Sequence, residues 1–275
     1  MKQKRLNPLV LLLISTLACV IPGLSAPAPA PFDPNMLSTI VVLTVDAAVS
    51  QTAAARPFVT ELPAGTTVPG MTGTTIEQVQ DGATKYSDYD GGFEVTFPAG
   101  WLAVRPNYSD EFNASMANDG ADNPALRNQM TTDLAGYDPN FDRLYSYVIR
   151  PDVEKNTIFG FSKMVWDSED TTSIDNTTMG ELVRGLESSG AIPGFRADTA
   201  QVRENGNAVM MIEIGGRFAM GDGQGGTIPY YTTIIFFKPT SNSLTRITFT
   251  FLQDYNAQIS TDVKSIIESI RMVGL

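Results

Sequence analysis

Histidine is absent from the 275-residue sequence, and cysteine occurs once, at Cys19. Without an imidazole the chain cannot form Ser-His-Asp or Cys-His nucleophile systems, HExxH zinc proteases or His-rich metal sites. A single cysteine excludes an intrachain disulfide framework, and its N-terminal position leaves no thiol for catalysis in the folded part. The sequence therefore lacks the side chains on which several large enzyme classes depend.

Basic residues are scarce as well, with 19 Lys and Arg against 30 Asp and Glu, a formal charge of -11. Lys2, Lys4 and Arg5 belong to the N-terminal targeting segment, which contains no acidic residue. The rest of the chain therefore has 16 of the 19 basic residues and all 30 acidic ones, a formal charge of -14. Nucleic acid and anionic headgroups are poor partners, because binding them requires clustered Lys and Arg. Cationic partners and metal ions remain compatible with this surface.

Residues 1–18 have the anatomy of a secretory signal, with a basic start, an apolar run at 9–14 and then small residues. The run is shorter than the ~20 apolar residues of a transmembrane helix. Residues 15–19, Ser-Thr-Leu-Ala-Cys, resemble a bacterial lipobox, in which the signal is cut before the cysteine and the cysteine is acylated. The sequence predicts lipid attachment at Cys19 and an extracytoplasmic, membrane-anchored chain. Simple secretion is the alternative, although proline follows both competing cleavage sites, Ala26 and Ala30.

Residues 19–85 read as a tether rich in Pro, Ala and Thr. Within it, 35–55 is predicted as a helix, because Asp33 can cap it and Pro34 suits its first position. This helix is either part of the tether or a surface that meets the membrane or a partner. Residues 57–82 are predicted as flexible linker, and 86–275 as a single domain.

Alternating apolar residues predict strands at 93–97 and, after a turn at 98–100, at 101–105. Residues 107–156 read as a polar, irregular insertion with a helix at about 124–134. A strand is predicted at 158–166, and a helix around 179–186 that ends near Gly190.

The last third reads as a meander of strands at 199–203, 209–220, 228–238 and 244–252, followed by a helix at 260–272. Asn205-Gly206 is a strong hairpin signal between the first two strands. The third strand is apolar on both faces and is predicted to be central. Together these elements predict an α+β fold, a three-layer αβα sandwich around an antiparallel β-sheet.

Residues 89–101, Tyr-Asp-Gly-Gly-Phe-Glu-Val-Thr-Phe-Pro-Ala-Gly-Trp, with the meander and a terminal helix that ends Glu268-Ser269-Ile270, resemble the PsbP/Mog1-like domain over residues 86–275. The resemblance implies an αβα sandwich and a non-catalytic role, and it carries no shared catalytic residues. Members include extrinsic photosystem subunits, a nuclear-transport cofactor and bacterial lipoproteins.

Two loops offer candidate chemistry. Residues 221–226 match G-x-G-x-x-G, but a strand follows where a dinucleotide site needs a helix, so a hairpin loop is favoured and no nucleotide is expected. Asp119, Asp122 and Asn123 supply the oxygen ligands that calcium prefers, without the EF-hand spacing. Weak Ca²⁺ binding is the candidate there, a solvated acidic loop is the default, and no other cofactor or metal is predicted.

Aromatic residues offer a candidate binding patch at Tyr108, Tyr230 and Tyr231, because aromatic side chains dominate binding hot spots. Trp101 and Trp166 are assigned to the core, and Tyr230 and Tyr231 point to opposite faces of their strand.

The sequence thus predicts a non-catalytic, lipid-anchored binding or assembly module with a protein partner in the cell envelope. A carboxylate-dependent hydrolase of envelope polymers is the alternative, since two acids can form such a site whatever their separation in sequence.

Overall fold

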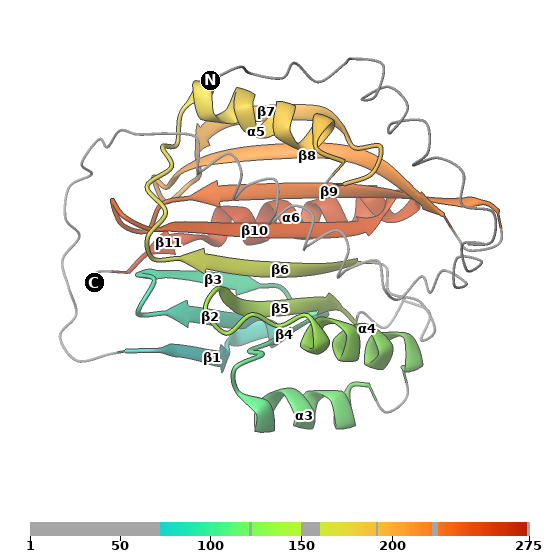
Figure 1. Ribbon diagram of the computed structural model, residues 1–275. Helices are drawn as coiled ribbons and strands as arrows, with labels where there is room; N and C mark the ends of the chain where they lie inside the picture. The colour runs from blue at the N-terminus through green and yellow to red at the C-terminus, as the bar shows by residue number, and fades with distance from the viewer. Residues whose placement is uncertain (1–71, 121–122, 150–159, 191, 222–224, 274–275) are drawn as a thin grey trace, which may run out of the picture. The chain divides into compact units, whose positions relative to one another are not determined.

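The computed structural model describes residues 72–120, 123–149, 160–190, 192–221 and 225–273, which all belong to one unit of the chain. The larger sheet of this unit has seven antiparallel strands in the order β4-β5-β6-β10-β9-β8-β7 (Figure 1). In chain order they are β4 (Trp101–Val104), β5 (Asp142–Val148), β6 (Gly160–Asp167), β7 (Arg196–Glu204), β8 (Met210–Gly221), β9 (Thr227–Phe237) and β10 (Leu244–Leu252).

The interior position of β9 confirms a prediction. β9 pairs with β10 on one side and with β8 on the other. Ile234, Ile235, Phe236 and Phe237 are each at most 1% exposed. Since successive side chains of a strand point to opposite faces, both faces of the sheet are covered here.

A smaller antiparallel sheet has the order β1-β2-β3-β11. Its strands are β1 (Thr74–Gln78), β2 (Thr84–Asp88), β3 (Phe93–Phe97) and β11 (Arg271–Met272), with a 3-10 turn, η2 (Gln80–Gly82), between the first two. The predicted turn at 98–100 is confirmed by the positive φ of Gly100, which favours glycine. This turn carries the chain from the smaller sheet, at β3, to the larger one, at β4.

The main core lies between one face of the larger sheet and a layer made of the smaller sheet and helix α6 (Asn256–Ser269), which follows the 3-10 turn η3 (Gln253–Tyr255). Strands β6, β8, β9 and β10 supply one side of the core, and the predicted alternation of β10 is confirmed by the buried Ile247, Phe249 and Phe251. The other side comes from Tyr86, Phe93, Val95 and Phe97 of the smaller sheet and from Ile259, Val263, Ile266 and Ile267 of α6.

Three helices lie on the opposite face of the larger sheet: α3 (Ser109–Asn118), α4 (Pro124–Ala135) and α5 (Asn176–Ser188) (Figure 1). Phe112 of α3 and Leu126 of α4 pack on β4 and β5, and α5 packs on β7. The predicted end of α5 is confirmed by Gly190, whose φ is positive. The described residues thus form an α+β fold of three layers, as predicted, with the smaller sheet sharing the layer of α6.

The linker prediction for 57–82 is wrong at its end, because Thr74–Gln78 forms β1. The segment Thr-Thr-Ile-Glu-Gln has little alternation to mark it as a strand. Antiparallel pairing with β2, from Thr74 opposite Asp88 to Gln78 opposite Thr84, supplies the backbone hydrogen bonds that sequence alone does not show.

The interpretation of 107–156 as an irregular insertion is also wrong for much of its length. The predicted helix there is confirmed as α4, but α3 and β5 are additional. β5 reads Asp-Arg-Leu-Tyr-Ser-Tyr-Val and looks polar, yet it lies inside the sheet between β4 and β6. Its polar groups are buried with partners: Ser146 Oγ lies 2.6 Å from Ser162 Oγ, and Tyr147 donates to Asp133 Oδ2 at 2.7 Å.

The predicted terminal helix is shifted toward the N-terminus. α6 begins at Asn256 and ends at Ser269, because Arg271–Met272 pairs with β3 as β11. Among the helices of the described residues, none has the length and apolar character needed to cross a membrane.

Candidate functional site

A groove of about 770 Å³ lies between α6 and the face of β7, β8 and β9. Alternation along the strands creates its polar floor: Arg203 and Glu213 face the groove, whereas Ile212 and Ile214 on the opposite face are buried. The residues that line it are Gln201, Arg203, Glu213, Tyr231 and Thr233 from the strands, and Asn256, Ser260, Thr261, Val263, Lys264, Ile267 and Glu268 from α6.

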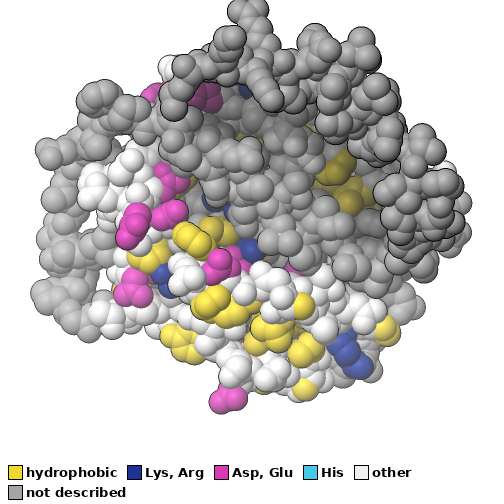
Figure 2. Space-filling model, in the orientation of Figure 1, with side chains coloured by type: hydrophobic (Ala, Val, Ile, Leu, Met, Phe, Trp, Pro, Cys, Tyr) yellow, Lys and Arg dark blue, Asp and Glu magenta, His cyan; other side chains and the backbone are white. Residues whose placement is uncertain are grey.

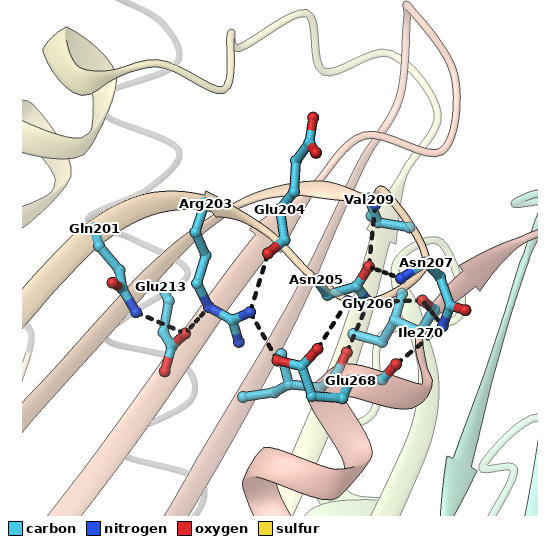
Figure 3. A network of polar contacts seen from close by, with 11 residues as sticks. Gln201, Arg203, Glu204, Asn205, Gly206, Asn207, Val209, Glu213, Glu268 and Ile270 are labelled. Carbon is cyan, nitrogen blue, oxygen red and sulfur yellow. Dashed lines mark hydrogen bonds and ion pairs between the residues drawn. The ribbon is translucent and has the colours of Figure 1, made fainter.

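Arg203 connects the strands that form the floor of this groove to α6 (Figure 3). Its Nε donates to Glu213 Oε2 at 2.6 Å, and its Nη1 donates to Glu268 Oε1 at 2.8 Å. Gln201 donates to the same oxygen of Glu213 at 3.2 Å. Burial lowers the pKa of Arg203, but the bonds to the two carboxylates outweigh it and raise the pKa above its ordinary value. The guanidinium is therefore a fixed positive charge.

Glu268 is held as a carboxylate. Its Oε2 accepts a hydrogen bond from the Gly206 N–H at 2.8 Å, and this bond, together with the weaker effect of Arg203, lowers the pKa of Glu268 despite the opposing effect of burial. A carboxylate with a lowered pKa stays ionised at neutral pH and does not serve as a general acid.

Asn205 ties the β7–β8 hairpin to the C-terminal end of α6, beside the groove (Figure 3). Its Nδ2 donates to the carbonyls of Ile267 at 3.0 Å and Ile270 at 2.7 Å, and its Oδ1 accepts from the N–H groups of Asn207 and Val209. The last carbonyls of a helix have no partner within the helix, so this side chain satisfies them. The predicted Asn-Gly hairpin is confirmed, and the helix fixes its position.

Tyr231 packs into the floor of the groove. Its ring lies 5.5 Å from the ring of Phe251, and burial raises the pKa of its hydroxyl. A Cβ at Gly215 would lie 2.5 Å from Tyr231 Oη and 2.7 Å from Thr199 Oγ1, so only glycine leaves room for the tyrosine here. The sequence had assigned Gly215 no role.

Of the three tyrosines predicted as a binding patch, Tyr231 alone lines the groove. Tyr230 is 8% exposed and stacks on Phe218 at 5.4 Å. Tyr108 precedes α3, next to β4, and three strands separate β4 from β9. Its ring lies 3.7 Å from the Arg105 guanidinium. The structure does not bring these three side chains together.

The candidate calcium ligands lie between α3 and α4. Asp119 caps the C-terminus of α3, and burial raises its pKa. Asn123 caps α4, its Oδ1 accepting from the Leu126 N–H at 3.0 Å. Asp122 lies outside the described residues, and among those residues no three acidic, cysteine or histidine side chains gather as a metal site. Calcium binding stays a prediction, and it requires a higher melting midpoint with Ca²⁺ than with a chelator.

Several other predictions concern residues outside the described ranges: the signal at 1–18, Cys19 and the helix at 35–55. In the glycine loop, Gly221 ends β8 and Gly225 precedes β9, while 222–224 lie outside these ranges. The loop therefore joins two strands, as predicted. The sequence did not identify Arg203, Glu213 or Glu268 as a group.

We expect the free energy of unfolding to fall as the pH is lowered from about 5 to 3, with a measurable share from Glu268. Its folded pKa lies below the unfolded value of about 4.3, so its contribution is present above that value and is lost as the pH falls through the folded pKa. Urea unfolding of Glu268→Gln should show a shallower fall, by less than about 1 kcal/mol because the side chain is 36% exposed. Glu77→Gln is the exposed control, and a slope for Glu268→Gln equal to wild type would disprove the coupling.

No protein-family model matches the chain, and no curated protein matches it. Among solved structures, it is similar to cyanobacterial PsbP from Synechocystis sp. PCC 6803, with 12% identity over 74% of this chain and 95% of that one, at a TM-score of 0.40. LpqN, involved in cell envelope biogenesis of Mycobacterium tuberculosis, has 10% identity over 75% of this chain and 99% of that one, at a TM-score of 0.40. The Ran-binding protein Mog1p of Saccharomyces cerevisiae has 10% identity over 70% of this chain and 95% of that one, at a TM-score of 0.40. PsbP and Mog1p are the two proteins after which the domain that residues 89–101 resemble is named.

Proposed function

We propose that this chain is a non-catalytic, extracytoplasmic lipoprotein that binds a protein partner in the groove beside α6. The groove itself is the observation that supports this function. It is an open polar site whose charged side chains are already held in place, by Arg203 between two carboxylates and by Asn205 at its end. Groups that are fixed before binding lose little conformational entropy when a partner arrives.

The same geometry disfavours the hydrolase alternative in this groove. A hydrolase with two carboxyl groups needs one of them protonated, with a raised pKa. Glu213 and Glu268 instead share the guanidinium of Arg203, and the pKa of Glu268 is lowered. These two acids are arranged for charge recognition.

The proposed membrane attachment is lipid modification of Cys19. It is supported by the lipobox-like residues 15–19 and by the prolines that follow the competing cleavage sites. Several acyl chains together make a stable anchor, since each buried CH₂ contributes ~0.8 kcal/mol. Cys19→Ala should move the chain from the membrane fraction to the soluble fraction.

Site-specific photo-crosslinking in intact membranes tests the groove. A photoreactive benzoylphenylalanine at Thr261, which is exposed on the groove side of α6, should give one specific protein adduct. The control position is Arg184, which is exposed on α5 at the opposite face of the sheet. The same adduct from both positions, or none from Thr261, would count against partner binding in the groove.

A further inference from the structure

The last strand of the larger sheet, β7, has a long outer edge. It pairs with β8 on one side, and no strand of the described residues lies on its other side (Figure 1). The strand has nine residues, and most of their side chains are exposed. An edge strand carries a row of backbone N–H and C=O groups that point away from the sheet and can pair with another chain.

The other sheet edges in the described part of the chain are shorter or covered. β4, at the opposite end of the larger sheet, has four residues and lies beneath Phe112 of α3 and Leu126 of α4. Figure 2 shows side chains closely packed over this end of the molecule. In the smaller sheet, β11 has two residues, and Arg105 donates to the Thr74 carbonyl at the start of β1. β7 is thus the longest edge strand in these ranges.

Only the first part of the β7 edge is protected. The Ala197 N–H donates to Glu187 of α5 at 3.1 Å, and a β-bulge interrupts the pairing with β8 between Ala197 and Thr199. Bulges and covering elements are common ways to protect an edge. From residue 200 to residue 204 the pairing with β8 is regular, and these residues include neither proline nor lysine. Residues 200–204 therefore form the open part of the edge.

Backbone groups in this part alternate in direction. At the hairpin, the Asn205 N–H donates to the Val209 carbonyl at 3.1 Å, so these two residues form a hydrogen-bonded pair. Bonded and non-bonded pairs alternate along an antiparallel ladder. The odd-numbered residues of the open edge thus bond to β8. The even-numbered ones direct their N–H groups away from it: Ala200, Val202 and Glu204.

The two faces of the open edge differ in character. Gln201 and Arg203 line the groove. Val202 pairs with Ile212 and therefore lies on the opposite face, as does Ala200. A strand added to β7 would extend the floor of the groove, with polar side chains beside Gln201 and Arg203 and apolar ones beside Ala200 and Val202. In an antiparallel pair, opposite residues share a face, so the apolar residues of the added strand are those that bond to β7.

We propose that β7 binds an extended segment of the protein partner as an added antiparallel strand along residues 200–204, and that this segment alternates apolar and polar side chains. This mode of binding rests on the proposed function, because the added strand lies beside the groove in which the partner binds. Main-chain hydrogen bonds would supply affinity, and side chains at alternate positions would supply specificity. A second copy of the chain fits less well, since five paired residues bury far less than the roughly 1,200–2,000 Å² of a stable interface.

Val202→Pro tests the open edge in the full chain in intact membranes. Proline lacks the N–H that the added strand would use, and an edge position whose N–H points away from the sheet tolerates it. The adduct from benzoylphenylalanine at Thr261 should fall at least about tenfold in yield, because a carbonyl of the partner loses its donor. The control is Gln78→Pro, on β1 at the edge of the smaller sheet, which should leave the yield unchanged.

A synthetic peptide gives a second measurement that does not depend on the fold of a proline variant. The probe is a nine-residue fluorescent peptide that alternates valine and serine, and the full chain is expected to bind it. N-methylation of the valines removes the N–H groups that face β7 and should weaken binding at least about tenfold. N-methylation of the serines removes groups that face away and should leave binding unchanged.

Each failure has a distinct meaning. An adduct from Thr261 that persists in folded Val202→Pro, or that falls equally in Gln78→Pro, would overturn strand addition and leave partner binding in the groove intact. No peptide binding, or equal effects of the two methylated peptides, would overturn it as well. No adduct from Thr261 in the otherwise unchanged chain would overturn the proposed function and strand addition together. A homodimer that Val202→Pro dissociates would replace the partner segment with a second copy. Circular dichroism confirms that each variant is folded.

Discussion

Lys163→Met is expected to lower the free energy of unfolding by about 3–5 kcal/mol, the typical cost of removing one partner from a buried ion pair. Lys163 Nζ lies 2.8 Å from Asp142 Oδ1, and the two side chains are 7% and 1% exposed. Methionine has a similar length but no charge, so the carboxylate of Asp142 would stay buried without its cation. Chemical denaturation of the full chain measures the change.

The matched control is Lys85→Met. Lys85 pairs with Glu77 at 3.1 Å, but these side chains are 24% and 51% exposed, and pairs at the surface contribute at most about 1 kcal/mol. If Lys163→Met lowers the free energy of unfolding no more than Lys85→Met does, burial does not increase the contribution of the Lys163–Asp142 pair to stability. Thr248 stands opposite Lys163 on β10, so the pair lies within the sheet and not at its edge.

Asn205→Ala is expected to lower the free energy of unfolding by about 3 kcal/mol and the melting midpoint by about 10 °C. The side chain is 7% exposed and makes four hydrogen bonds to backbone groups. Alanine would leave the buried Val209 N–H without this acceptor, and a buried unsatisfied group costs roughly 1–3 kcal/mol. It would also remove one of the two donors to each of the Ile267 and Ile270 carbonyls, which keep the Ile270 N–H and Asn207 Nδ2.

Asn207→Ala provides the comparison. Asn207 is exposed and donates to the Glu268 and Ile270 carbonyls, which water can satisfy in its absence. Its loss should cost about 1 kcal/mol or less. Equal costs at the two positions would mean that Asn205 does not anchor the hairpin to α6. If it does anchor it, Asn205→Ala should also weaken partner binding in the groove, because Arg203 stands two residues before Asn205.

Alternation predicted the strands well where one face is apolar and the other polar, as in β3 and β10, and where both faces are apolar, as in β9. It failed where polar groups are buried in pairs. Ser146 faces Ser162, and Tyr145 donates to Asp142 at 2.7 Å, so β5 looks irregular in sequence although it is interior in the sheet. Burial of such groups depends on partners that the pattern of one strand does not contain.

The groove could not be predicted from the sequence for a related reason. Arg203 and Glu268 are 65 residues apart, and they meet because the β7–β8 hairpin reaches the end of α6. The Asn-Gly turn predicted a hairpin, but nothing near it in sequence indicates that Asn205 also bonds to the carbonyls of Ile267 and Ile270. Likewise, the sequence assigned Trp166 to the core, whereas it is half-buried beside the exposed Phe141.

The most direct measurement is the affinity of the partner, recovered by crosslinking at Thr261, for a variant with a filled groove. Ser260→Trp places a large ring on the groove side of α6, and Arg184→Trp adds the same ring on the opposite face of the sheet. Binding in the groove predicts a loss of at least about tenfold, or 1.4 kcal/mol, for Ser260→Trp and none for Arg184→Trp. Equal affinities for Ser260→Trp and wild type would contradict it.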